Sequence, residues 1–430
     1  MSGGVRMRIE GSVKPGFEGL RKTFQRRMAS SKEINAQLCI YVGEECVVDL
    51  WSSVTDDPNF GPDSLVNVFS SGKSLESIAI AMLVDRGLID YDDAISKHWP
   101  EFAKESKHSI TLADLMRHES GLANFTQSID PEKLTPKALK KNSLGQIIEN
   151  EKPWFTEGAK NPREYHAITR GWVANELFRR VEPGGRTLGE FLREEISEPL
   201  EIDVFIGLKD DEIHRVAPVS VVPLSRQILS RFRPSIFGRD TELNILGLLQ
   251  SYLRIRSTFS GQSRRRLPAP IVGMGKNIRE IDMDIFNSKS YAEGEIPSAG
   301  AKCSARGLAK LASAMANQGR YKNLTFLSKG GHAAMHEGIE SRRMSLLNTS
   351  FTQSGLAYFE GRSTFDDPME KGLVEGREGF FGWMGFGGSI FQWHPRLKIG
   401  FSFVPTSLNW LDLVNERGKT YQRELLKCLR

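Results

Sequence analysis

Strand-forming patterns stand at both ends of this chain, and helical patterns fill the stretch between them. Near the start, residues 37–51 carry β-forming side chains on either side of a turn signal at Gly43, which predicts a hairpin. Near the end, residues 388–392 and 397–404 predict two more strands, separated by a turn at Pro395. A chain that begins and ends in strands can pair its last strands with its first, so we expect one antiparallel sheet built from both termini.

The helical patterns predict a second, inserted region. Apolar residues recur with helical spacing in several segments, at residues 75–86, 112–117, 169–181, 188–196, 242–253, 305–317 and 411–429. We therefore expect an α/β protein of the α+β type, in which helices flank the antiparallel sheet. A single domain is predicted over residues 15–430, with a sheet lobe from about 15–60 and 290–430 and a mainly helical lobe from about 61–289, which includes a basic insertion at about 222–290. A functional site is expected where the two lobes meet.

One predicted helix begins with a serine and a lysine three positions apart. Ser70 and Lys73 stand before a run of apolar residues at 78–84, and residues three apart share one face of a helix. The Lys73 amine can therefore take the proton of the Ser70 hydroxyl, helped by the helix N-terminus and by desolvation, which lowers the pKa of a lysine. The alternative is a helix-capping serine and a solvated lysine. The catalytic pair is favoured because this is the only S-x-x-K in the chain and it heads the most apolar helix.

Two later segments offer the other groups that such a pair needs. Tyr165 stands just before the predicted helix at 169–181, where its phenol can relay protons beside Lys73; a packed aromatic ring is the alternative. The stretch 382–389 is rich in glycine and leads into a predicted strand, so a backbone N–H there can approach a substrate closely and stabilise an oxyanion. For these glycines the alternative is a bulge or a tight turn.

The chain resembles the serine β-lactamase-related family. In that family an S-x-x-K pair, a tyrosine motif and a glycine-rich strand follow one another in the same order as here. That family includes class C β-lactamases, D-alanyl-D-alanine carboxypeptidases, esterases of the same fold and animal β-lactamase-like proteins. The similarity covers nearly the whole chain, with further matching segments at residues 86–93, 99–102, 110–122, 165–172 and 299–309. The resemblance implies a β-lactamase/transpeptidase-like fold.

The resemblance also implies a role for each group of the predicted site. It makes Ser70 the acylated nucleophile, Lys73 its base, and Tyr165 the proton relay to and from the leaving group. It makes the backbone N–H groups of Ser70 and Phe386 the oxyanion hole. The chain is thereby expected to be a serine hydrolase of the S-x-x-K type that acts through an acyl-enzyme, with no cofactor and no metal.

The third motif departs from the family's pattern. Trp383 stands two residues before Gly385, where many relatives carry a lysine or a histidine that grips a substrate carboxylate. Ala167 stands where class C enzymes place an amide side chain. We therefore expect a small uncharged ester or amide to be bound by Trp383, Gly385, Gly387 and Ala167. The alternatives are an inactive β-lactamase-like binding or scaffolding protein and, second, a D-amino-acid peptidase.

The charge distribution and the cysteines limit which partners and which compartment the chain can have. No apolar run approaches the ~20 residues of a membrane-spanning helix. The stretch from Arg226 to Glu280 holds eleven basic and three acidic residues, which predicts a solvated loop or a surface for an acidic partner, and no nucleic acid. The four cysteines form no C-x-x-C pattern and favour a cytoplasmic compartment, with mitochondrial import as the alternative because the N-terminus is basic.

His332 and His336 lack further ligands in the sequence around them, so we expect them at the surface.

Overall fold

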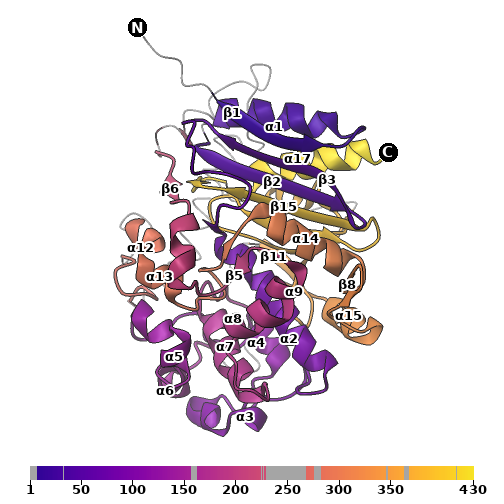
Figure 1. Cartoon of the computed structure of the whole chain (residues 1–430). Helices are drawn as coiled ribbons and strands as arrows, with labels where there is room; N and C mark the ends of the chain where they lie inside the picture. Colours follow the sequence, from indigo (N-terminus) through magenta and orange to yellow (C-terminus); the bar gives the residue numbers. More distant parts are fainter. Residues whose placement is uncertain are drawn as a thin grey trace.

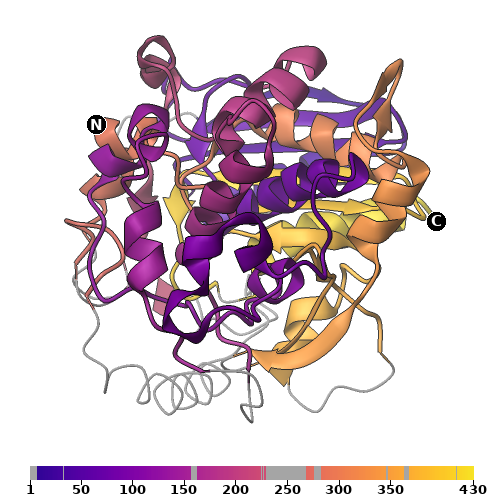
Figure 2. The same ribbon diagram turned by 90° about the horizontal axis from the view of Figure 1, so that it is seen from below.

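The computed structural model describes residues 7–31, 33–155, 162–223, 225, 227–228, 268–275, 282–344, 347–362, 368–412 and 414–430. Figure 1 shows a sheet with helices on both of its faces and a larger helical region below it. The C-terminus lies on the side of the sheet that faces away from this helical region (Figure 1). Figure 2, in which the molecule is seen from below, shows the helices in front of the sheet.

In the described part of the chain, one antiparallel sheet of nine strands joins N-terminal and C-terminal segments. Its strands are β1 (Arg8–Val13), β2 (Asn35–Val42), β3 (Glu45–Ser53), β10 (Glu340–Met344), β11 (Leu347–Phe351), β12 (Ala357–Tyr358), β13 (Phe381–Met384), β14 (Ile390–His394) and β15 (Ile399–Pro405). Their order is β1-β3-β2-β15-β14-β13-β12-β11-β10, so β2 and β15 form the seam between the two ends, with Phe401 opposite Ile40. The predicted fold class and the sheet from both termini are confirmed. β1 lies before residue 15, where we expected the domain to begin.

Helices cover both faces of this sheet. α1 (Glu18–Ser31) and α17 (Glu416–Cys428) lie side by side on one face, and α14 (Ala305–Ala316) lies on the other (Figure 1). The central strands are therefore buried on both sides, and every residue of β15 is buried. The helix expected from residue 411 begins only at Glu416, because Asn415 has a left-handed φ of 51° that a right-handed helix cannot include.

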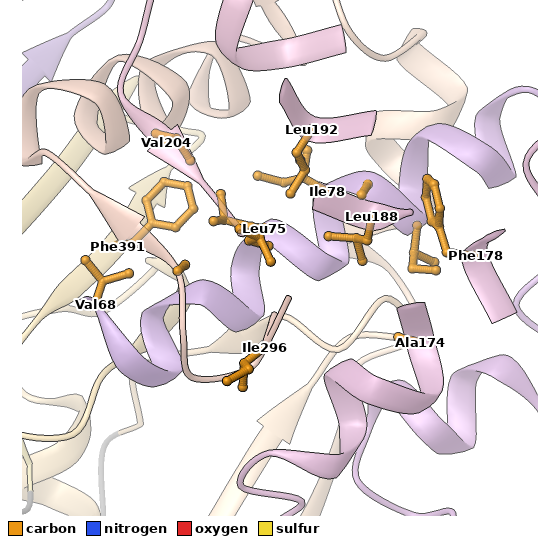
Figure 3. Close-up of a cluster of buried hydrophobic side chains, with 14 of the residues drawn as sticks. Val68, Leu75, Ile78, Ala174, Phe178, Leu188, Leu192, Val204, Ile296 and Phe391 are labelled. Carbon is orange, nitrogen blue, oxygen red and sulfur yellow. The ribbon is translucent and has the colours of Figure 1, made fainter. Parts of the chain in front are cut away.

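α2 (Lys73–Asp85) runs through the helical region and is buried along most of its length. It packs against α7 (Thr169–Val181) and α8 (Leu188–Leu192). Figure 3 shows Leu75 and Ile78 of α2 beside Leu188 and Leu192 of α8. This apolar packing fixes α2, and with it the residues at its N-terminus, relative to the rest of the molecule.

The other predicted helices differ from the structure mainly at their ends. α7 has the predicted bounds, and α4 (Leu112–Met116) and α14 each end one residue early. α8 ends at Leu192, and a π-helical turn over Arg193–Ser197 replaces the rest of the expected helix. The helix expected at 242–253 and most of the basic stretch at 226–280 lie outside the described residues.

The remaining described elements are short. The α-helices are α3 (Ile95–His98), α5 (Pro136–Leu139), α6 (Gly145–Asn150), α9 (Glu198–Leu200), α12 (Asp284–Asn287), α13 (Lys289–Glu293), α15 (Lys329–His336) and α16 (Pro368–Val374). The strands are β4 (Val66–Asn67), β5 (Val204–Phe205), β6 (Ser220–Val221), β7 (Lys302–Cys303), β8 (Arg320–Tyr321), β9 (Leu324–Thr325) and β16 (Ser407–Leu408), and the 3₁₀ segments are η1 (Phe69–Gly72), η2 (Pro100–Ser106), η3 (Pro131–Leu134) and η5 (Asp210–Arg215). Within the described ranges, none of the helices is long and apolar enough to cross a membrane.

The packing of α2 predicts a large effect of shortening Ile78, which is fully buried. Ile78→Ala is expected to lower the free energy of unfolding by about 2–5 kcal/mol, because it removes buried apolar volume and leaves a cavity. Leu429→Ala is the control, since Leu429 is 37% exposed, and it should cost less than about 0.5 kcal/mol. Urea unfolding followed by circular dichroism measures both, and equal effects of the two variants would contradict this account of the core.

Candidate active site

Ser70 lies in a strained turn that leads into α2. β4 precedes it, and the 3₁₀ turn η1 carries the serine directly to the first residue of α2. Phe69 has a left-handed φ of 48°, which a non-glycine residue adopts at a cost that packing must offset. Its ring packs between those of Phe286 and Phe386, at centroid distances of 5.1 and 5.7 Å. The turn leaves Ser70 only half-buried, at the wall of a cavity.

The Lys73 amine is buried one helical turn beyond Ser70. Its Nζ lies 3.4 Å from Ser70 Oγ and donates hydrogen bonds to the backbone carbonyls of Ala167 (2.6 Å) and Ser298 (3.0 Å). The side chain is 1% exposed, and this burial holds the pKa of Lys73 well below its ordinary value, although the Glu76 carboxylate acts to raise it. Burial therefore shifts Lys73 toward the neutral amine that a proton acceptor requires.

Tyr165 also contacts the Ser70 hydroxyl oxygen. Its hydroxyl donates a hydrogen bond of 2.8 Å to Ser70 Oγ, and its ring centroid lies 5.0 Å from Lys73 Nζ. Desolvation raises the pKa of Tyr165 above its ordinary value, so the phenol keeps its proton and can donate it. The structure thus brings together the three side chains that the sequence singled out for chemistry.

Trp383 donates a hydrogen bond to Tyr165. Its indole Nε1–H lies 3.1 Å from the Tyr165 hydroxyl oxygen, and its backbone N–H donates to Ser74 Oγ at 2.9 Å. A chain of donors therefore runs from Trp383 through Tyr165 to Ser70. The sequence placed Trp383 at the substrate surface but gave no sign of this contact, which joins residues that are far apart in the chain.

The glycine-rich turn between β13 and β14 approaches Ser70 closely. A Cβ atom on Gly385 would come within 2.2 Å of the Val68 carbonyl oxygen, and Gly387 has a left-handed φ of 80°. Among the residues that the structure describes, no acceptor is found for the backbone N–H of either Ser70 or Phe386. These two amides are therefore available to bind an oxyanion.

The N-terminal end of α17 holds this turn in place. The Arg417 guanidinium donates to the carbonyl of Gly387, and Asn415 Nδ2 donates to the carbonyl of Ser389 at 2.8 Å. Arg417 is itself paired with Glu33 and with Asp412, whose Oδ2 lies 3.1 Å from its Nε. The position of the turn thus depends on charged groups that sequence reasoning missed, because nothing in their local sequence marks them.

A buried ion pair lies beneath Lys73. Arg170 Nε lies 2.8 Å from Glu76 Oε2, and both side chains are fully buried. Arg170 also donates to the Lys73 carbonyl at 2.8 Å, while the other Glu76 oxygen accepts from Ser298 Oγ at 2.5 Å. Sequence reasoning missed Glu76 and Ser298; the spacing of Lys73 and Glu76, three apart on one helix, was the available signal.

The predicted site residues line one cavity of about 570 Å³. Its lining includes Ser70, Tyr165, Ala167, Trp383, Gly385, Phe386 and Gly387. Lys73 lies behind Ser70 and reaches it from the buried side.

His332 and His336, which we expected at the surface, are half-buried. His336 accepts a hydrogen bond of 2.9 Å from the Trp393 indole, and His332 donates one of 2.8 Å to the Met315 carbonyl. Their rings pack against each other with centroids 4.2 Å apart. Over the part of the chain that the structure describes, no cluster of histidine, cysteine and acidic residues is arranged to hold a metal ion.

The chain matches known proteins over almost its whole length. The family model described as Beta-lactamase matches residues 20–422. Esterase/beta-lactamase LipL of Mycobacterium tuberculosis is 27% identical over 405 residues, which cover 93% of this chain and 83% of that protein. The crystal structure of a penicillin-binding protein homolog from Caulobacter crescentus has a TM-score of 0.72 at 26% identity, covering 98% of this chain and 100% of that one. A family VIII carboxylesterase shares the fold, with a TM-score of 0.71 at 22% identity over 96% of this chain and 100% of that one.

The buried pair under Lys73 predicts a large cost for removing one partner. Arg170→Met is expected to lower the free energy of unfolding by about 3–5 kcal/mol, because it leaves the Glu76 carboxylate buried without its counter-charge. Lys427→Met breaks a pair with Glu424 in which the lysine is 69% exposed, and this control should cost at most about 1 kcal/mol. Urea unfolding of both variants is the measurement, and similar small costs would show that the buried pair does not support the site.

Proposed function

This chain belongs to the beta-lactamase family, and we propose that it is a serine hydrolase that cleaves an ester or an amide through an acyl-enzyme on Ser70. The observation that carries the proposal is that two groups meet at Ser70 Oγ: the Tyr165 hydroxyl at 2.8 Å and the Lys73 amine at 3.4 Å. Acyl transfer requires a nucleophile, a base and a proton donor that meet at one point of a cavity.

In the acylation step, Ser70 Oγ forms a bond to the carbonyl carbon of the substrate while its proton moves to the neutral Lys73 amine. The carbonyl oxygen becomes an oxyanion, which the backbone N–H groups of Ser70 and Phe386 stabilise. The bond to the leaving group then breaks. The departing alcohol or amine takes the proton from Lys73 by way of the Tyr165 hydroxyl, which leaves an ester on Ser70 and a neutral lysine.

In the deacylation step, a water molecule attacks the ester carbonyl. Tyr165 and Lys73 accept the proton of the water through the same relay, and the oxyanion forms again in the same hole. Its collapse expels Ser70 Oγ, which regains the proton. The acid is released and the resting state is restored.

The lining of the cavity supports an uncharged substrate. Trp383 takes the place where relatives carry a cation, and among the described lining residues the charged ones are Glu164 and Asp412, both acidic. A substrate carboxylate would find no cation to pair with among these described residues. An ester or amide without a terminal carboxylate is therefore proposed in preference to the D-amino-acid peptide that the second alternative requires.

A cytoplasmic compartment remains our proposal for this enzyme. All four cysteines are free thiols, including Cys39 and Cys46, whose sulfur atoms share a hydrogen bond of 3.8 Å and no disulfide bond. Free thiols favour a reducing compartment. The acidic partner proposed for the basic stretch at 226–280 rests on the sequence, because most of that stretch lies outside the described residues.

A fluorophosphonate probe tests whether Ser70 is a reactive nucleophile. The wild type should be labelled at Ser70 and should hydrolyse simple esters, while Ser70→Ala should lose both properties because it lacks the attacking oxygen. Ser96→Ala is the matched control, since Ser96 bonds the His108 carbonyl outside the cavity, and it should be labelled like the wild type. A wild type that neither reacts with the probe nor turns over any ester would favour the inactive binding protein.

The buried amine predicts the pH dependence of kcat/KM. Only the neutral form of Lys73 can accept the serine proton, so kcat/KM should rise with pH through the pKa of Lys73, well below the ordinary lysine value of 10.5. Lys73→Arg keeps its proton and should lower kcat/KM by about a thousandfold or more.

Lys107→Arg is the control for this experiment. Lys107 is also a buried lysine, whose pKa burial lowers to about 8, and its amine donates to the carbonyls of Glu149 and Glu151 rather than to the site. The pH profile should keep its position in this variant. A profile that moves with Lys107→Arg but not with Lys73→Arg would assign the titration to the wrong lysine and contradict the mechanism.

A further inference from the structure

One side of the cavity around Ser70 is formed by aliphatic side chains from three separate elements. We call them the aliphatic wall, which consists of Met344 at the end of β10, Leu347 at the start of β11, and Met369 and Leu373 of α16. Three of these side chains belong to the buried cluster against which Tyr165 and Trp383 also pack. Apolar surface is therefore continuous from the residues beside Ser70 to the wall.

The chemistry proposed above makes no use of this wall. Acyl transfer needs only the oxygen, the base, the proton donor and the two amides, all of which lie at Ser70. A cavity of about 570 Å³ is in the size range that encloses a whole drug-sized ligand, far more than an acetyl group fills. The wall is therefore available to bind a part of the substrate that does not react, and such binding can be used to lower the reaction barrier.

The charges around the cavity restrict what this part can be. Of the two acidic groups in the described lining, Asp412 is already paired with Arg417, and no described lysine or arginine lines the cavity. An anionic group placed there would lose its hydration without gaining a cationic partner from the described lining, and the four side chains of the wall offer no charge to a cation. An aliphatic chain has no hydrated charge to lose, and it gains contacts with the wall. The two methionines can adapt their flexible side chains to its shape.

We propose that the substrate of this enzyme is an ester with an unbranched, uncharged aliphatic chain longer than four carbons, and that this chain lies against the aliphatic wall. The inference rests on the proposed function, and it names the class of substrate. Each methylene that the wall removes from water should raise kcat/KM by about threefold until the wall is covered. The chain belongs either to the acyl group or to the alcohol, and both would be recognised by the same apolar contacts.

Two series of esters test the inference. The first varies the acyl chain, from p-nitrophenyl acetate to p-nitrophenyl decanoate, and the second varies the alcohol, from ethyl acetate to decyl acetate. We expect kcat/KM to rise by about threefold per methylene in one series, and that series identifies the end of the ester that the wall holds. A profile that is flat or falls with chain length in both series overturns the inference, while hydrolysis of the acetates would leave the proposed function intact.

A bulky substitution in the wall tests where the chain lies. Leu347 is half-buried and should accept a larger side chain, so Leu347→Trp is expected to fill part of the cavity. In the responding series, the ratio of kcat/KM for the eight-carbon ester to that for the two-carbon ester should fall by about tenfold. Leu324→Trp is the matched control at a half-buried leucine of β9 that does not line the cavity. Equal ratios in both variants would overturn the inference.

A binding measurement separates this inference from the proposed function. Trp383 and Trp410 line the cavity, so tryptophan fluorescence of the Ser70→Ala variant reports binding without any catalysis. We expect 1-octanol to bind about 80-fold more tightly than 1-butanol, at about threefold for each of the four extra methylenes. This result supports the aliphatic wall even if Ser70 fails to react with a fluorophosphonate. Equal affinity for the two alcohols would overturn the inference that the aliphatic wall binds the chain, whether or not the fluorophosphonate labels Ser70.

Discussion

The Lys73 amine is buried with no carboxylate within ion-pair distance in the described structure, and the rest of the site depends on this arrangement. Its partners are a serine hydroxyl and two backbone carbonyls, which offset less of the cost of dehydration than a carboxylate would. Glu76, one turn further along α2, is held by Arg170 instead. Because burial places the folded-state pKa of Lys73 below its unfolded value, the amine destabilises the folded protein at neutral pH, and stability rises as the pH climbs from the folded to the unfolded value. Such a cost is typical of a functional group.

Both ends of the chain are needed to complete the cavity. Ser70, the proposed nucleophile, stands just before the start of α2 in the helical region, whereas the amide of Phe386 belongs to a turn of the sheet. That turn is held by Arg417 of α17, and Arg417 is neutralised by Glu33 from the N-terminal part of the chain. The ion pairs at this end of the molecule therefore hold the turn that carries the Phe386 amide, one of the two proposed oxyanion donors. The geometry of the proposed catalytic site is thereby coupled to contacts between the first and last segments of the chain.

Structural features that depend on a few neighbouring residues could be predicted from the sequence. Local periodicity predicts that Ser70 and Lys73 share one face of a helix. It also predicts the bounds of α7 and the hairpin of β2 and β3. The family resemblance, which the family match confirms, is what links Tyr165 and Phe386 to Ser70 across long stretches of sequence. What could not be predicted are the contacts between distant segments, such as the Trp383 indole on Tyr165, the Glu76–Arg170 pair and the α17 side chains on the glycine turn, because the sequence around one partner does not identify the other.

The proposed chemistry depends on the protonation state of Lys73 in the resting protein. Nitrogen-15 NMR of protein labelled at its lysine side chains measures it directly, and the missing signal of the Lys73→Met variant assigns the resonance. The account predicts that the Lys73 nitrogen titrates well below the exposed lysines, because burial lowers its pKa. A Lys73 nitrogen that titrates together with the exposed lysines would contradict the account, since Ser70 would then have no base beside it at neutral pH.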